Sequence, residues 1–253
     1  DMHLMTDGVT RAYIDSDGNV GIGTSSPSTT ASGYNGGTLH MHNTGTGSSI
    51  RLTNTTTGTG ASDGMLISKW NNSNTYFTNF DNDAETIFTQ SNSSGSLQTT
   101  LNLNGNGHVT TPNQTSFLAG MSGAQSLNNA TVTKVNFNQA VEQTGSSYNT
   151  SNYRFTCPVA GRYLFTYHVY VYSVKNMEVK LYKNGSSLIR IASPVAYQNE
   201  NPHGGGGSTV LQANANDYFE IYAAGYRSDT STSLVYPGSG SERASHFSGM
   251  LIG

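Results

Sequence analysis

The sequence predicts an all-β protein, and three observations carry that prediction. Its clearest apolar stretches alternate with a period of two residues, which is typical of strands, and helical periodicity is nearly absent. The chain is rich in Ser, Thr and Asn and has 29 Gly, while only 11% of its 253 residues are charged. Such a composition fits short strands joined by tight turns. A disordered chain would carry high net charge and few aromatics, whereas this one has a net charge of -3 with 15 Tyr and 9 Phe.

Composition divides the chain into three regions. Residues 1–30 are expected to form an N-terminal β segment with a strand at Arg11–Ile14, residues 31–112 a β-rich shaft, and residues 113–253 a head with longer strands. The boundary of the head falls near Pro112, a breaker that follows a run of Asn and Gly. The strands expected in the shaft are Thr38–His42, Ser49–Thr53, Gly64–Trp70, Thr75–Phe80, Thr86–Gln90 and Gln98–Leu103.

The shaft contains too few large apolar residues to build a private core. We therefore expect three chains to share one core around a common axis, as an intertwined trimeric β shaft. The alternative is a small independent sandwich. Cys157 is the single cysteine, so no intrachain disulfide can replace the missing core, and oligomerisation is the expected source of stability.

The head is expected to be a two-layered β structure. Tyr153–Val174 predicts a strand, a turn at Pro158 to Gly161 and a second long strand with two apolar or aromatic faces, one for the core and one for a partner subunit. Asn184–Gly185 predicts a tight hairpin after Met177–Lys183. The remaining expected strands are Ser187–Ala192, the pair Ser208–Gln212 and Asp217–Ala223, and His246–Ile252, which ties the C-terminus into the sheet.

An ordered set of motifs in the head resembles the C1q/tumour-necrosis-factor-like domain. The matching pieces are SFLA at Ser116–Ala119, YN at Tyr148–Asn149, YRFTCPVAGRYLFTYHV at Tyr153–Val169, KNG at Lys183–Gly185, STVLQ at Ser208–Gln212 with Asp217, and HFSGMLIG at His246–Gly253. The resemblance implies a ten-stranded jelly roll that assembles as a tight trimer and acts as a recognition head. Collagen-type repeats, which precede many animal members, are missing from this sequence, so a complement or adipokine role is not expected.

Two upstream segments resemble phage tail-fibre and tailspike sequences. They are RAYIDSDGNVGIGTSSP at Arg11–Pro27 and LHMHNTGTGSSIRLTNTTTGTGASDGMLI at Leu39–Ile67. This resemblance implies a homotrimer on the virion, outside the cell, joined to upstream fibre or baseplate proteins.

His40-Met41-His42 is the sharpest local motif. Residues two apart on a strand point to the same face, so three chains around an axis would bring six imidazoles together. Six imidazoles suit octahedral coordination of Fe²⁺ or another divalent transition metal, an arrangement similar to that of trimeric phage fibres. The alternative is that both histidines are exposed polar residues.

Oxygen ligands for calcium are available at Asp81, Asp83 and Glu85, which alternate along the chain, and at the loop residue Asp217. The alternative for the first three is a solvated turn between two strands. Paired carboxylates also serve glycoside cleavage, but no other catalytic motif accompanies them. Cys157 has no histidine partner in sequence and is expected to be an inert buried thiol, so we expect no enzyme and no catalytic residues.

Charge and hydropathy argue against nucleic acid and membranes as partners. The 12 basic residues form no stripe for nucleic acid, and no apolar run approaches the roughly 18 residues of a membrane span. No signal-peptide pattern precedes Asp1.

Two loops of the head are expected to bind a bacterial surface glycan or protein receptor, because Tyr with Asn and Ser provides rigid contact area and adaptable hydrogen bonds. The alternatives are loops without a partner, a structural virion decoration or bacterial surface fibre, and a polysaccharide depolymerase fragment. The candidate receptor-binding residues are Tyr197, Gln198, Asn199, Glu200, Asn201, His203, Tyr226, Arg227 and Tyr236.

Overall fold

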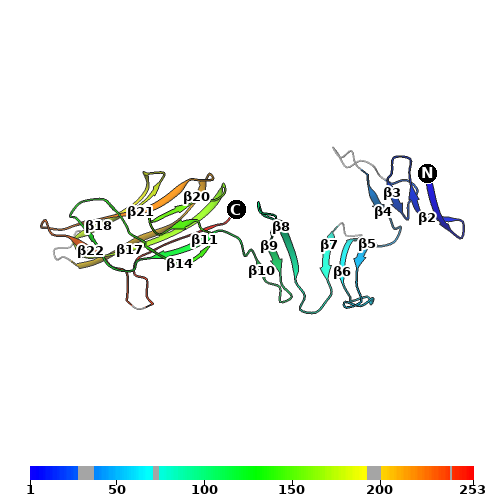
Figure 1. Ribbon diagram of the computed structural model, residues 1–253, viewed down its shortest axis with the longest axis horizontal. Coiled ribbons are helices and arrows are strands. Elements are labelled where there is room, and N and C mark those ends of the chain that lie inside the picture. The colour runs from blue at the N-terminus through cyan, green and yellow to red at the C-terminus, as the bar shows by residue number, and fades with distance from the viewer. Residues whose placement is uncertain (28–36, 71–73, 193–200, 240) are drawn as a thin grey trace. The chain divides into compact units, whose positions relative to one another are not determined.

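The computed structural model describes residues 1–27, 37–70, 74–192, 201–239 and 241–253. In these ranges every regular element is a strand, which confirms the all-β prediction (Figure 1). No helix of the described residues is long and apolar enough to cross a membrane. The chain groups into two compact units, the first being Asp1–Phe88 with Leu101–Thr110 and the second Thr89–Thr100 with Thr111–Gly253.

The strands before residue 111 form three small sheets rather than one layer pair. Their orders are β1-β2-β3-β4, β5-β6-β7 and β10-β9-β8. The six strands predicted for the shaft lie within two residues of their observed bounds, whereas β1, β3 and β10 were not predicted. The bounds are β1 (Met2–Thr6), β2 (Val9–Ile14), β3 (Val20–Ile22), β4 (Leu39–Met41), β5 (Gly47–Leu52), β6 (Met65–Trp70), β7 (Thr75–Asn79), β8 (Thr86–Ser91), β9 (Leu97–Leu103) and β10 (Val109–Thr110).

These small sheets have no private apolar core. Among the described residues 1–110, no large hydrophobic side chain is buried, and those most exposed include Met2, Leu4, Leu39, Phe77 and Val109. The thin core expected from the sequence is therefore observed in one chain, and the described strands do not form an independent sandwich.

The head is a jelly roll of two sheets, as the sequence predicted. The first head sheet has the order β12-β22-β17-β23-β11-β14 with β20 also paired to β17, and the second has β15-β16-β21-β18-β19 with β13 paired to β21. The bounds are β11 (Ser116–Gly120), β12 (Gln125–Leu127), β13 (Thr133–Lys134), β14 (Gln139–Thr144), β15 (Tyr148–Asn149), β16 (Arg154–Thr156), β17 (Gly161–Val174), β18 (Asn176–Lys183), β19 (Ser186–Ala192), β20 (Asn201–Ala213), β21 (Tyr218–Tyr226), β22 (Ser233–Val235) and β23 (His246–Leu251).

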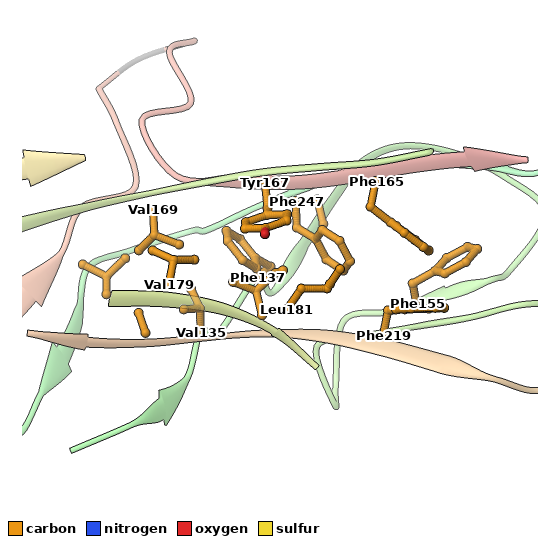
Figure 2. Packing of buried hydrophobic residues seen from close by; sticks show 14 of the residues in the cluster. Val135, Phe137, Phe155, Phe165, Tyr167, Val169, Val179, Leu181, Phe219 and Phe247 are labelled. Carbon is orange, nitrogen blue, oxygen red and sulfur yellow. The ribbon is translucent and has the colours of Figure 1, made fainter. Parts of the chain in front are cut away.

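Aromatic side chains from both sheets fill the space between them (Figure 2). Phe165 of β17 packs against Phe219 of β21 with ring centroids 4.3 Å apart, and Phe117 of β11 stacks on Phe155 of β16 at 4.6 Å. One of the two apolar faces predicted for β17 lies in this core, and all five of its residues are buried, namely Tyr163, Phe165, Tyr167, Val169 and Val171.

A tight turn and a terminal hydrogen bond define the ends of strands in the head. Asn184 and Gly185 both have positive φ, 52° and 82°, and close the β18–β19 hairpin as predicted. At the C-terminus, Ile252 N donates to Arg162 O at 2.8 Å, so the chain end is tied to β17.

The predicted pairing of Ser208–Gln212 with Asp217–Ala223 is wrong. β20 pairs with β17 in the first head sheet, whereas β21 pairs with β18, β16 and β13 in the second. The connector between them therefore crosses from one layer to the other. β20 also begins at Asn201, so the four glycines Gly204–Gly207 lie in a strand and not in a loop.

Candidate functional site

The outer face of the first head sheet presents apolar and aromatic side chains in register. Val210, Leu164 and Met250 are partners across β20, β17 and β23, and Val210 and Met250 are 45% and 43% exposed. The next row holds hydroxyls, with Thr166 Oγ1 3.1 Å from Ser208 Oγ. We call this surface the interface face; its residues are Val210, Leu164, Met250, Thr166, Ser208, Ser248, His168, His246, Tyr170, Tyr172 and Leu234.

Two histidines and the neighbouring tyrosines complete the interface face. His168 and His246 are partners in register with stacked rings 6.0 Å apart, and His168 Nδ1 lies 2.6 Å from Ala244 O. Burial lowers the pKa of the His246 imidazole, the Arg243 carbonyl opposes this change, and His168 adds to it. Tyr172 lies edge-on to Tyr170 at 5.3 Å.

Only two of the six candidate receptor residues of the first loop belong to the part of the chain that the structure describes. Tyr197, Gln198, Asn199 and Glu200 lie outside the described residues. The other two belong to β20 and not to a loop, which corrects their expected setting: Asn201 begins the strand, and half-buried His203 is the register partner of Val171.

The candidate residues of the second loop belong to different sheets. Tyr236 follows β22 and packs edge-on against Tyr172 at 5.1 Å, on the interface face. Tyr226 is the last residue of β21 in the second head sheet, where its side chain hydrogen-bonds Glu178. Arg227 Nε donates to Asp229 Oδ1 at 2.9 Å and Nη1 to Ser173 O at 2.6 Å, so its guanidinium braces the loop.

His40 lies in β4 and His42 directly follows that strand, and their ring centroids are 6.1 Å apart. One chain thus offers two imidazoles, and no group of three or more metal-ligating side chains occurs within the part of the chain that is described. The pair fits the chemistry of an axial metal only if three chains combine, so the metal stays a proposal.

Three of the four acidic residues considered for calcium accept hydrogen bonds from protein groups. Asp81 Oδ1 accepts from Gly64 N at 3.0 Å, Glu85 Oε2 accepts from Asn102 Nδ2 at 3.1 Å, and Asp83 lies in the turn between β7 and β8. Asp217 accepts from Lys183 Nζ at 2.8 Å and from Asn184 Nδ2 at 2.7 Å. These contacts assign Asp217 a bracing role between two turns.

Cys157 is fully buried, as expected for a structural thiol. Burial raises the pKa of this thiol to about 12, so it stays protonated and non-nucleophilic at neutral pH.

Two buried glutamates were missed by the sequence analysis. Glu220 of β21 and Glu178 of β18 lie on the outer face of the second head sheet, and each holds two cations. Their signal was available, because MEVKLYK and YFEIYAAGY alternate apolar residues with charged residues and tyrosines. Only the pairing of β18 with β21 shows that the two alternating sets share one face.

Together the fold and the two outer faces define a β-sandwich head of the jelly-roll class. The chain belongs to the C1q domain family, since the family model described as "C1q domain" matches residues 116–252. This finding confirms the expected C1q-like head. It does not bear on the resemblance of residues 11–27 and 39–67 to phage fibres.

Curated relatives and solved structures are similar to part of the chain. Human "Complement C1q and tumor necrosis factor-related protein 9A" is 33% identical over 91 residues, covering 36% of this chain and 26% of that protein. The mouse protein 9 of that name is 34% identical over 71 residues, covering 28% and 21%. The chain thus spans about a quarter of the length of these relatives. The globular domain of zebrafish complement 1qA protein has a TM-score of 0.41 at 18% identity, and the match covers 55% of this chain and 98% of that one. Murine APRIL has a TM-score of 0.42 at 14% identity, and the match covers 55% of this chain and 99% of that one.

Proposed function

We propose that this chain is the trimeric, non-enzymatic receptor-binding end of a phage tail fibre, which attaches the virion to a bacterial surface glycan or protein. The interface face carries the trimeric part of the proposal. Its row of Val210, Leu164 and Met250 is an apolar surface on a sandwich that already has a complete core. Covering such a surface removes apolar area from water, and a second copy of the chain is the complementary partner in a homo-oligomer.

The strands before residue 111 support the same assembly independently. Their exposed apolar side chains need partners that one chain does not supply. Three chains around one axis would bury them in a shared core. The resemblance of these segments to phage fibres supports the setting: a fibre on the virion, outside the host cell, attached to upstream fibre or baseplate proteins.

The electrostatics of the carboxyl groups favour recognition over glycoside cleavage. A glycosidase needs one carboxylic acid with a raised pKa as proton donor. Among the described residues, every carboxyl group whose pKa shifts has a lowered pKa, namely Asp15, Glu178, Asp217, Glu220 and Asp229. A depolymerase is therefore the weaker proposal, and a purely structural fibre remains the other alternative.

Two measurements on one purified sample test the proposal. Sedimentation equilibrium should give three times the 26.9 kDa chain mass. The fluorescently labelled protein should decorate a subset of strains in a panel of bacteria and release no reducing sugar from them. A monomer would overturn the assembly, reducing sugar would favour the depolymerase, and a trimer that decorates no strain would favour the structural fibre.

A further inference from the structure

The outer face of the second head sheet concentrates cations and tyrosines. On β21, Phe219 (Figure 2) and Ile221 belong to the core between the sheets, so the alternating residues Tyr218, Glu220 and Tyr222 lie on the opposite side of the strand. β18 repeats this pattern, because Lys180 and Tyr182 are register partners of Tyr222 and Glu220. We call this surface the basic face and define it by Lys134, Arg154, Lys180, Arg190, Tyr182 and Tyr222.

Glu220 holds the first pair of cations in place. Its side chain is 2% exposed, and Oε1 accepts from Lys134 Nζ at 2.7 Å and from Arg154 Nε at 2.9 Å. Arg154 is held from a second direction, since its guanidinium lies 3.6 Å from the centroid of the Tyr218 ring. The cations themselves reach solvent, with side chains 27% and 31% exposed.

Glu178 holds the second pair in the same way. Its side chain is 4% exposed and pairs with Lys180 Nζ at 2.9 Å and with Arg190 Nε at 2.5 Å. Arg190 is the most open of the four cations at 61%. Burial raises the pKa of Glu178 and of Glu220, but hydrogen bonds from Lys180 and Tyr226 to the first, and from Lys134 and Arg154 to the second, outweigh it and lower both values.

The resulting surface is positive although the chain is acidic overall. Four cations face two carboxylates, which leaves an excess of two positive charges (4 − 2) on a chain of net charge -3. The carboxylates lie beneath and the cations above, so an approaching molecule meets the positive groups. Guanidinium has five N–H donors and ammonium three, so the glutamates do not use all of them.

Between the two cation pairs lie two tyrosines whose rings stack on each other. Tyr182 and Tyr222 stack with ring centroids 4.0 Å apart, and Lys134 Nζ lies 6.0 Å from the Tyr222 centroid. Both tyrosines are only half-buried, so a sugar ring can contact the solvent-exposed side of the pair while its carboxylate accepts from a neighbouring Lys or Arg. An excess of two charges is small for nucleic acid, whose binding relies on neutralising many phosphates.

We infer that the basic face binds an acidic glycan, a bacterial polysaccharide that carries uronate carboxylates. The inference rests on the proposed function, because it names the receptor class and moves the site from the head loops to a sheet face. This face is on the opposite side of the sandwich from the interface face, so it stays accessible in the proposed trimer. Three copies on one head would bind a repeating polymer with increased avidity.

Affinity electrophoresis of the full chain in gels containing alginate, with dextran gels as the neutral comparison, tests the inference. We expect alginate, and not dextran, to retard the protein, and added NaCl to weaken the retardation. Arg190→Gln and Lys134→Gln should each weaken alginate binding by roughly three- to tenfold, since each removes one charge-assisted partner. Lys180 and Arg154 remain to hold the glutamates, so both variants should keep the thermal midpoint within a few degrees.

Arg11→Gln is the matched control, because it removes the same charge from β2, outside the head. Its alginate binding should equal that of the parent chain. Equal binding of alginate by all variants, or no binding by the parent, would overturn the inference. Equally strong binding of single-stranded DNA would overturn the glycan assignment. A trimer that decorates bacteria without binding alginate would refute this inference and leave the proposed function standing.

Discussion

Gly249 lies in β23 at a point where the core leaves no room for a side chain. A Cβ there would come within 2.7 Å of Phe165 Cδ1 and 2.8 Å of Phe117 Cε1. We predict that Gly249→Ala lowers the free energy of unfolding by about 1–3 kcal/mol, because packed rings must shift to accept the methyl group. Urea unfolding measures this change.

The matched control for that substitution is Gly123→Ala. A Cβ at Gly123 would meet no atom within 4 Å, and its φ is not positive. Its unfolding midpoint should stay close to that of the parent chain. Equal midpoints for the two variants would contradict the packing described for β23.

His246 should make the stability of the head depend on pH. Burial lowers its pKa below the ordinary value of 6.5, so below that value the unfolded chain takes up a proton that the folded chain resists. Stability is then fully present above pH 6.5 and decreases as the pH falls through the lowered pKa. We expect the urea midpoint to drop between pH 7.5 and 5.5, and His246→Gln to reduce that drop. An unchanged slope in the variant would assign the effect to other groups.

The elements differ in how far sequence alone could predict them. Strands with strict alternation and strong turn signals were placed closely, as with β18, its Asn184–Gly185 turn and β19. β20 was predicted too short because four glycines usually indicate a loop. Here Gly206 lies where a Cβ would be 2.1 Å from Tyr167 O, so the strand pairing itself requires glycine.

The local sequence pattern could not predict which strands pair with each other. The short connector after β20 is typical of a hairpin, and nothing in its residues shows that β20 and β21 enter opposite sheets. The basic face could not be predicted for the same reason. β13, β16, β18 and β21 are separated in sequence and become neighbours only through the order of strands in the sheet. The charges could be seen in sequence, but their convergence on Glu220 and Glu178 could not.

Asp217 joins the β18–β19 turn to the connector between β20 and β21. Its Oδ1 accepts from Asn184 after β18, and its Oδ2 accepts from Lys183 and, at 2.8 Å, from Asn214 N of the connector after β20. Hydrogen bonds from Lys183, Asn184 and Asn214 lower the pKa of Asp217 to about 2. Its stabilising contribution is therefore fully present above the ordinary value of 3.8 and is lost as the pH falls toward 2.

We accordingly expect Asp217→Asn to lower the thermal midpoint at pH 7 and to make stability less dependent on pH between 4 and 2. Glu142→Gln, on exposed strand β14, is the control and should change neither quantity. Parallel pH profiles for Asp217→Asn and the parent chain would show that the two turns do not depend on this carboxylate.

For the whole molecule, the interface face predicts which exposed apolar residue matters for assembly. Met250→Glu places a charge in the row shared with Leu164 and Val210 and should convert the trimer to monomers, since an unpaired charge would be buried between subunits. Leu188→Glu is the matched control, because Leu188 is similarly exposed at 47% but belongs to β19 of the second head sheet. Sedimentation equilibrium should show a trimer for Leu188→Glu and a lower mass for Met250→Glu. Dissociation by the control instead would place the interface on the other sheet.

The shaft histidines give the most demanding prediction at this scale, because the proposed site does not exist in one chain. His40 and His42 supply two neighbouring imidazoles, so an octahedral site made of six imidazoles can form only if three chains meet at the axis. Purified protein should therefore contain about one-third of a mole of iron, or of another divalent transition metal, per mole of chain.

His40→Ala and His42→Ala should each remove the metal and lower the melting temperature of the assembly. His108→Ala, at a residue between β9 and β10, is the control and should do neither. Elemental analysis of trimers with no transition metal would show that the two histidines are only polar surface residues, and a metal retained by both variants would place it elsewhere.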